Sequence, residues 1–309
     1  MMTEENSKKN VREFYNQVGW KLVDESLYQN AQFEDLRPVS RDYIHRCHLR
    51  VKKHLSPEGR YLLDAGSGPV QYPEYLTYSE DYHARVCMDI SIVALQEARK
   101  RLGDHGRYVV GDIAHLPFKS DVFDGIVSLH TIHHVPMEDK LQAYDELYRT
   151  LTPGSSMVVV NGWTQAPLMI RLSSFMDFMK RFRSWWLRKI KKKKLKEIDT
   201  QQQDGSGFNA EYEDSKESPE GTYVQKLTAS WLTQALEGKM DYEILVWRSV
   251  SVRFLRSVIH ADWGGRFWLK VLYGLEELFP RILGRIGQYP LIVVDKPKDT
   301  EQGISAVKV

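Results

Sequence analysis

The sequence predicts an α/β protein with a Rossmann-like, mostly parallel, seven-stranded sheet and helices on both of its faces. Short apolar runs alternate with segments of helical periodicity between residues 60 and 162, which is typical of repeated βαβ units. Three of the runs end in an aspartate, at Asp64, Asp89 and Asp112. Because the carboxyl ends of parallel strands meet at one edge of a sheet, where such sheets bind ligands, the three acids are expected to line one site.

The elements of this core follow in a regular order. Strands are expected at 61–64, 84–89, 107–111, 123–129 and 156–161, and helices at 72–78, 91–102 and 138–150. Ser91 is placed to cap the second helix, and Pro153 with Gly154 forms the tight turn before the fifth strand. Later in the chain, 228–236 and 263–286 are expected to be helical, and 242–252 and 290–295 to contain the last two strands.

Four regions are expected along the chain. Residues 1–59 form an N-terminal helical lid segment with helices at 11–28 and 41–55, and residues 60–162 form the ligand-binding core. Residues 163–221 contain a basic amphipathic helix and a flexible acidic loop, and residues 222–309 complete the sheet around a second helical insertion. The two insertions are expected to roof an apolar substrate pocket above the strand ends.

A turn with two glycines follows the first strand. Gly66 and Gly68 stand where the backbone must approach a ligand closely and adopt positive φ angles. Asp89 lies about 20 residues further on, where nucleotide-binding α/β units place a carboxylate that accepts hydrogen bonds from ribose hydroxyls. A dinucleotide is disfavoured, because Gln71 stands where a third small residue is needed and Pro69 crowds the turn.

With these residues in view, the chain resembles the class I S-adenosylmethionine-dependent methyltransferases, in particular small-molecule enzymes of the ubiquinone-biosynthesis type. The matching segments are 64–69, 89–90, 111–113 with 116–118, 123–128 and 151–154, within a resemblance that covers about 62–162. It implies that S-adenosylmethionine is the cofactor and that transfer of its methyl group is the activity. The cofactor-binding residues that it implies are Asp64, Ala65, Gly66, Ser67, Gly68, Asp89, Ile90, Asp112, Ile113 and Leu129.

The resemblance also implies a role for each acid. Asp64 orients the amino group of the cofactor, Asp89 binds the ribose hydroxyls, and Asp112 contacts the adenine edge while Ile113 covers its face. For Asp64 and Asp112 the alternative is a carboxylate that caps a helix.

Three histidines follow the fourth strand and are the candidate catalytic residues. His130, His133 and His134 carry side chains that titrate near neutral pH, which suits removal of a proton from an acceptor. Related ubiquinone-pathway enzymes carry a Glu-x-x-Glu-His pattern that can hold a divalent metal, and this chain departs from it. Imidazole suits zinc better than magnesium, and we expect no metal. The alternative for these histidines is a structural hydrogen bond or a place in the pocket lining.

Three further residues have two interpretations each. In the resembling family, N-terminal helices pack over the cofactor, so Tyr15 and Arg37 are candidates for cofactor or substrate contact. The alternative is that Tyr15 is part of the core and that Arg37 pairs with a neighbouring acid. His260 is a candidate on the second insertion, although an isolated His-x-Asp is more often structural.

The segment 168–198 combines apolar periodicity with many cations. Apolar residues recur at three- and four-residue steps at Leu168, Leu172, Phe175, Met179, Phe182, Trp186 and Ile190, and lysines or arginines fill 180–181, 183, 188–189, 191–194 and 196. A basic amphipathic helix with tryptophan on its apolar face is typical of an anionic membrane interface. A lid helix with a solvated lysine tail remains an equal alternative. Nucleic acid binding is disfavoured, because no fold for reading bases accompanies the cations.

Composition narrows the compartment but not the substrate. The chain has 42% hydrophobic residues, a net charge of +2 and two cysteines without metal-type spacing. No run is long enough to span a membrane, and the N-terminus lacks the apolar core of a signal peptide. A cytoplasmic location is expected, with peripheral membrane contact left open. The leading function is methylation of a hydrophobic or lipid-linked small molecule; the alternatives are a soluble polar metabolite as acceptor and a non-catalytic cofactor-binding protein.

Overall fold

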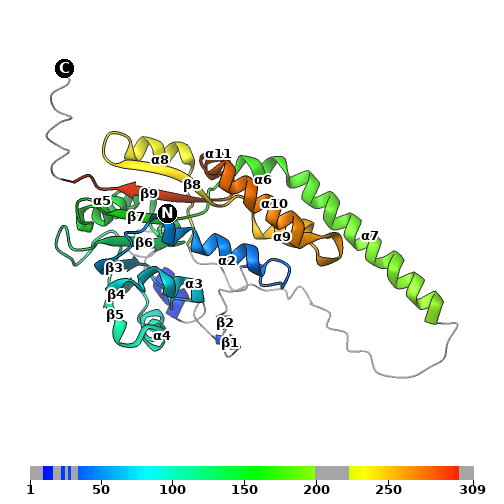
Figure 1. Ribbon diagram of the computed structural model, residues 1–309, viewed down its shortest axis with the longest axis horizontal. Coiled ribbons are helices and arrows are strands. Elements are labelled where there is room, and N and C mark those ends of the chain that lie inside the picture. The colour runs from blue at the N-terminus through cyan, green and yellow to red at the C-terminus, as the bar shows by residue number, and fades with distance from the viewer. Residues whose placement is uncertain (1–9, 17–21, 25–26, 29–33, 199–222, 299–309) are drawn as a thin grey trace, which may run out of the picture.

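The computed structural model describes residues 10–16, 22–24, 27–28, 34–198 and 223–298 of the 309-residue chain. Its centre is a seven-stranded sheet in the order β5-β4-β3-β6-β7-β9-β8 (Figure 1). Five strands pair in parallel, and β9 runs antiparallel to both β7 and β8. The predicted fold class is therefore confirmed. The strands are β3 Gly59–Ala65, β4 Tyr82–Asp89, β5 Gly106–Val110, β6 Gly125–Leu129, β7 Ser156–Val160, β8 Asp241–Arg248 and β9 Tyr289–Asp295.

The sheet has a hydrophobic core on each face. Neighbouring residues along a strand point to opposite faces, so Leu62 and Val158 belong to one core while Leu63 and Val159 belong to the other. The first core is covered by α2 (Arg41–Leu49), α3 (Pro73–Leu76), α4 (Ile92–Leu102) and parts of the C-terminal helices, and the second by α5 (Lys140–Thr150) and α8 (Ala229–Leu236). Ser91 caps α4 as predicted, because its hydroxyl accepts a hydrogen bond from the Ala94 amide at 3.2 Å.

The N-terminal segment differs from the prediction. Of the described residues in the helix expected at 11–28, those at 11–16 are helical, whereas β1 (Leu22–Asp24) and β2 (Leu27–Tyr28) pair as a short antiparallel hairpin. The apolar residues of 11–28 do not fall on one helical face, so a continuous helix there would have no stripe to bury. The acidic loop expected at 200–220 lies outside the described residues.

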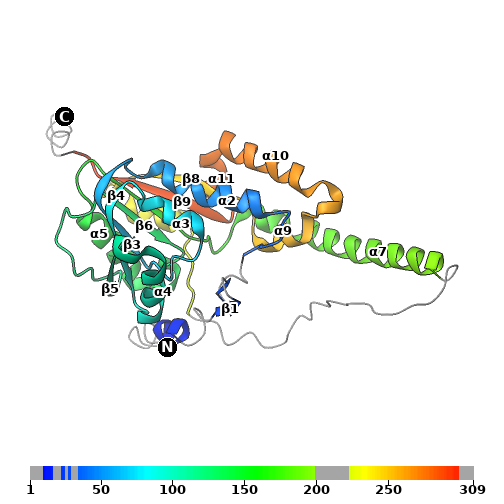
Figure 2. The same ribbon diagram turned by 60° about the horizontal axis from the view of Figure 1, so that its bottom comes forward.

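The two helical insertions lie at one end of the sheet. The first contains α6 (Pro167–Arg171) and α7 (Ser173–Ile198), and the second contains α9 (Val252–Val258), α10 (Gly265–Leu278) and α11 (Pro280–Ile286). The start of α7 packs along α9, and α7 then extends past every other labelled element in both views (Figure 1 and Figure 2). Within the described part of the chain, no helix is long and apolar enough to cross a membrane.

A buried ion pair joins β3 to β4 directly beneath the glycine turn. The Arg85 guanidinium, which is fully buried, donates to Oδ2 of Asp64 at 2.5 Å through Nη2 and at 3.2 Å through Nε, and Nη1 donates to the Tyr75 carbonyl. Loss of one partner would leave the other charge buried and without compensation. The pair therefore fixes the strand end that carries the turn.

We predict that Arg85→Met lowers the free energy of unfolding by about 3–5 kcal/mol, because it leaves the Asp64 carboxylate buried without its cation. Urea denaturation followed by circular dichroism measures this. The double variant Asp64→Asn, Arg85→Met removes both charges and should regain part of the loss. If the single and double variants are equally destabilised, the two charges do not depend on each other.

Candidate functional site

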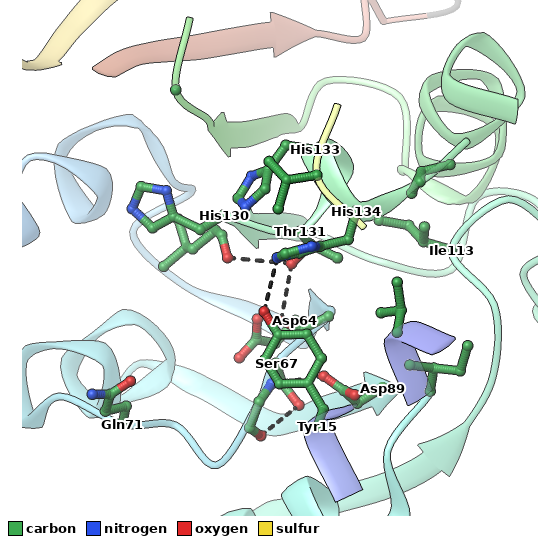
Figure 3. A pocket seen from close by; sticks show the side chains of 18 of the residues that line it. Tyr15, Asp64, Ser67, Gln71, Asp89, Ile113, His130, Thr131, His133 and His134 are labelled. Atoms are coloured by element: carbon green, nitrogen blue, oxygen red, sulfur yellow. Dashed lines mark hydrogen bonds between the residues drawn. The ribbon is translucent and has the colours of Figure 1, made fainter. Parts of the chain in front are cut away.

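A cavity of about 620 Å³ opens at the carboxyl ends of β3, β4 and β6, a size typical of sites for small molecules and cofactors. The glycine turn and the acids line one end of it, and aromatic and basic side chains line the other. Figure 3 shows the three histidine rings gathered on one side, opposite Asp64, Ser67 and Asp89. The edge of the sheet that the sequence indicated is therefore the edge where the cavity lies.

The glycine turn is shaped by positive φ angles. Gly66 has φ 76° and Gly68 has φ 53°, values that glycine adopts without steric cost. A Cβ on Gly66 would stand about 2.2 Å from the Thr131 side chain, so no other residue fits there unless the next loop moves. The Gly66 amide donates to the Met88 carbonyl at 2.7 Å, which ties the turn to the neighbouring strand.

Asp89 closes β4 and is held by the backbone. Its Oδ2 accepts from the Gly68 amide at 2.9 Å and its Oδ1 accepts from the Ser91 amide at 2.8 Å. Burial raises the pKa of this carboxyl to about 6, against the lowering effect of the two amides. Each oxygen keeps further acceptor capacity, because a carboxylate has about four lone-pair sites. Asp89 therefore faces the cavity as a positioned acceptor.

The other predicted cofactor residues are distributed around the same end. Nine of the ten line the cavity; Ala65 is the exception, since its side chain is buried in the core. Asp112 lines the cavity and also accepts from the Ala114 amide at 3.0 Å. This contact lies in a turn, so Asp112 does not cap a helix as its alternative interpretation expected. Asp64 reaches the cavity too, but one of its oxygens is committed to Arg85, a partner that the sequence analysis did not identify.

His130 directly follows β6 and has a backbone conformation that is rare for residues with a side chain. Its φ is 57°, which costs on the order of 1–3 kcal/mol and is found mostly at functional sites. The backbone is held by a hydrogen bond from the His130 amide to the Val160 carbonyl at 2.7 Å. The ring packs edge-on against Trp247 and Tyr289, and within the described chain its nitrogens make no hydrogen bond. They are therefore free to meet a ligand.

The other two histidines differ in what their nitrogens do. His134 is committed on both sides: its Nε2 lies 2.8 Å from the Tyr15 hydroxyl and its Nδ1 lies 2.9 Å from the Tyr223 carbonyl. The buried Nδ1 of His133 has no partner among the described residues. Burial lowers the pKa of all three, to about 3 for His130 and about 4 for His134, so each ring is neutral near pH 7.

Tyr15, Arg37 and His260, which had two interpretations each, differ in where they lie relative to the cavity. Tyr15 lines the cavity and reaches His134 from the N-terminal helix. Arg37 lies outside the cavity lining and pairs with Asp35 at 2.7 Å, as its structural alternative predicted. His260 also lies outside the lining, with one nitrogen 3.1 Å from the Ser257 carbonyl. Within the described residues, no group of three or more histidines, cysteines or acids is arranged to hold a metal ion.

The cavity roof is not the one predicted. None of the described residues of α6, α7, α9, α10 or α11 lines the cavity. Residues of the helix at 10–16, residues at the start of α3 and just before it, and Val224 and Lys226 line it instead. The inward side of α10 packs on the core through Leu269, and its remaining apolar stripe faces solvent, so apolar composition alone did not reveal which surface the helix covers.

Four residues at the end of the cavity lined by aromatic and basic side chains were missed by the sequence analysis. Trp247 and Arg248 come from the end of β8, Tyr289 from the start of β9, and Lys226 from the segment before α8. They meet because β9 is antiparallel, which brings its first residue to the edge where the other strands end. An aromatic–basic pair at the end of a predicted strand was the available signal.

A buried lysine fixes the histidine loop to the segment that carries Lys226. Lys140 is fully buried, and its ammonium donates to the carbonyls of Ile132, Val135 and Gln225 at 2.7–2.9 Å. In addition, the Gln225 amide donates to the His133 carbonyl at 2.7 Å. These contacts join two stretches of chain 85 positions apart. They therefore hold the histidine loop and the segment that carries Lys226 together.

Comparison with known proteins agrees with this geometry. Residues 63–159 match the family model described as a methyltransferase domain. The chain is 27% identical over 138 residues to the probable tRNA methyltransferase 9B of Mus musculus, an alignment that covers 44% of this chain and 29% of that protein. The chain thus spans less than a third of this relative's length.

Two solved structures share the fold over nearly the whole chain. The first is phosphoethanolamine N-methyltransferase 1 of Haemonchus contortus with phosphoethanolamine and S-adenosylhomocysteine, with a TM-score of 0.54, 11% identity, and 96% and 51% of the two chains covered. The second is geranyl diphosphate C-methyltransferase of Streptomyces coelicolor A3(2) with Mg²⁺, geranyl diphosphate and S-adenosylhomocysteine, with a TM-score of 0.51, 13% identity, and 94% and 97% covered. Residues 63–159 therefore match a methyltransferase domain, and the chain shares the fold of these two methyltransferases.

Proposed function

We propose that the protein transfers a methyl group from S-adenosylmethionine to a small molecule with a hydrophobic body, and that it does so at an anionic membrane surface. The observation that carries the first part is the division of one cavity into a glycine-and-acid end and an aromatic end. The names of relatives include enzymes of tRNA and of small molecules, so the choice between these rests on the cavity itself.

The residues of the first end suit the donor. Asp89 supplies a carboxylate for the ribose hydroxyls, Ile90 and Ile113 supply apolar surface for the adenine, and Gly66 to Gly68 supply bare backbone for the methionine portion. When bound, the donor supplies an electrophilic methyl group on a sulfonium. The protein's own task is then to align an acceptor and exclude water.

The residues of the other end suit an apolar or aromatic acceptor. The rings of Trp247 and His48 stack at 5.3 Å, and Trp247 and Tyr289 meet edge to face at 5.8 Å. Such walls bury flat or apolar groups and exclude water. We assign His130 as the group that accepts the acceptor's proton, because it is neutral, its ring nitrogens make no hydrogen bond within the described part of the chain, and it lines the cavity.

The proposed contact with a membrane is supported by the apolar side chains that are exposed on α7, α10 and α11. Among the residues whose exposure is described, 18 large apolar side chains are exposed, and fourteen of them belong to α6, α7, α10, α11 and the residue between the last two. Those on α7 are Phe175, Phe178, Phe182, Trp185, Trp186 and Leu187, and those on α10 are Phe267, Trp268, Val271, Leu275 and Leu278. Exposed apolar surface on this scale marks an interaction site.

The charges beside these stripes favour an anionic lipid surface as the partner. Between 171 and 189 the chain has six cations and one acid, Asp177, which is paired with Arg253. The cations continue beyond that, at Lys191 to Lys194. Tryptophan and phenylalanine on one face with lysine and arginine beside them are typical of helices that lie in the headgroup region. A hydrophobic acceptor dissolved in the bilayer would then be close to the enzyme.

We predict that affinity for S-adenosylhomocysteine falls about tenfold between pH 7.5 and pH 5. Asp89 must be ionised to accept from the ribose, and with a pKa of about 6 it takes up a proton as the pH falls through that value. Calorimetry at the two pH values measures the change. Asp89→Asn should bind at least tenfold more weakly at pH 7.5 and lose the pH dependence. A pH dependence that survives in this variant would mean that another group is responsible.

We predict that His130→Asn lowers methyl transfer by about 10²- to 10⁴-fold, the range for loss of a general base. Asparagine is chosen because it tolerates the positive φ of this position. The assay incubates the protein with radiolabelled S-adenosylmethionine and a fractionated native extract, and counts label in lipid and in water-soluble products. S-adenosylhomocysteine affinity should be unchanged, and His83→Asn, at an exposed position, serves as the control. Label confined to water-soluble products or RNA would refute the hydrophobic acceptor.

We predict that the protein sediments with vesicles that contain phosphatidylserine and much less with pure phosphatidylcholine. Replacing Lys191 to Lys194 with glutamine should weaken binding by on the order of a hundredfold or more, because each lysine contributes about 1 kcal/mol near an anionic surface. The triple variant Phe178→Ser, Trp185→Ser, Trp186→Ser removes exposed side chains only and should release the protein. Equal binding to both vesicles, a stable dimer through this surface, or tighter retention by tRNA would contradict the proposal.

A further inference from the structure

The aromatic end of the cavity contains a lysine without a counterion. Lys226 is half-buried in the cavity lining, and within the described chain its Nζ has no hydrogen-bond or ion-pair partner. Burial lowers its pKa, yet the side chain stays in the wall and does not reach an acid. A cation placed in this way indicates a site for an anion, because partly buried charges are normally paired.

The position of Lys226 is fixed on both sides. Its carbonyl accepts from the Thr164 hydroxyl at 2.6 Å, and the adjacent Gln225 is tied to His133 and Lys140. The side chain runs over Gly162: a Cβ built there would lie 3.5 Å from Nζ of Lys226 and 3.5 Å from the Tyr289 ring. Lysine and tyrosine thus stand side by side at the end of β7, beyond His133 from the glycine turn.

A second cation lies at the same end. Arg248 is fully buried, with its guanidinium 4.7 Å from the centre of the Tyr289 ring, and Nη1 pairs with Glu34 at 2.5 Å. Its Nε has no hydrogen-bond partner among the residues that the structure describes. Glu34 balances Arg248, so among the described residues of the aromatic end the positive charge of Lys226 stays uncompensated. The remaining acids of the cavity, Asp64, Asp89 and Asp112, belong to the donor end.

Resting on the function proposed above, we propose that the acceptor carries an anionic group, a carboxylate or a phosphate, which Lys226 binds with Arg248 behind it while the aromatic walls hold the apolar body. The anion lies on the β7 side of His130, so it also fixes which atom of the acceptor meets the histidine. The two cations help to keep the pKa of His130 low. A bound anion offsets them and makes that ring a better base when the correct acceptor is present.

The test uses the protein saturated with S-adenosylhomocysteine and four small aromatic probes. Calorimetry compares phenyl phosphate and phenylacetate with the neutral phenylacetamide and the cationic phenethylamine. Either anion should bind at least tenfold more tightly than the amide, and the cation least; the preferred anion identifies the class. Lys226→Met should remove the preference, whereas Lys239→Met, at an exposed site outside the cavity, should not.

Two results would overturn the proposal. One is equal binding of the anions and the amide, or binding that is unaffected in both Lys226→Met and Lys226→Gln. The other is a loss of S-adenosylhomocysteine affinity of tenfold or more in these variants, or competition of the anions with that ligand, because Lys226 would then serve the donor's carboxylate. Failure of the wild-type protein to bind S-adenosylhomocysteine would count against the proposed function instead, so the two failures are distinguishable.

Discussion

The aromatic end of the cavity depends on one buried ammonium group. Within the described residues, Lys140 makes no hydrogen bond to a side chain. Its ammonium donates to three backbone carbonyls, from Ile132, Val135 and Gln225. Burial lowers its pKa to about 8, and the carbonyl dipoles are what make its burial tolerable. Because the carbonyls belong to two stretches of chain, the lysine fixes their relative position. The histidine loop and the wall that carries Lys226 therefore form one rigid unit.

The sequence predicted where the glycine turn and the three acids lie, for a physical reason. Strand ends, glycine turns and the acids that follow them are local patterns, and the parallel sheet converts their order along the chain into neighbouring positions at one edge. Asp64, Asp89 and Asp112 lie at that edge because each ends or follows its own strand. Local sequence patterns could not predict that Arg85 pairs with Asp64, because this pairing depends on the register of β3 and β4.

The aromatic end of the cavity was predicted less well, because it is assembled from segments that are far apart in the sequence. Lys226, Arg248 and Tyr289 come from three separate elements, and only the antiparallel placement of β9 brings them together. The prediction for the two apolar insertions was wrong in another way: they were expected to cover the cavity, and their described residues do not line it. Residues 265–286 have the composition of a core, and composition cannot distinguish a face that covers a pocket from one that faces outward. Phe267 and Trp268 are exposed, so the surplus of apolar side chains belongs to the surface.

His130 connects the two ends by its backbone as well as by its ring. A positive φ at the residue that follows β6 turns the side chain out of the strand direction and toward Trp247 and Tyr289. The strain persists because the amide is bonded to β7 and the ring is packed, and both contacts oppose relaxation. Desolvation, with Arg248 and Lys226 nearby, keeps the ring neutral but weakly basic in the free protein. A base of this kind gains strength only when charge in its surroundings changes, so proton removal would be coupled to the acceptor that is bound.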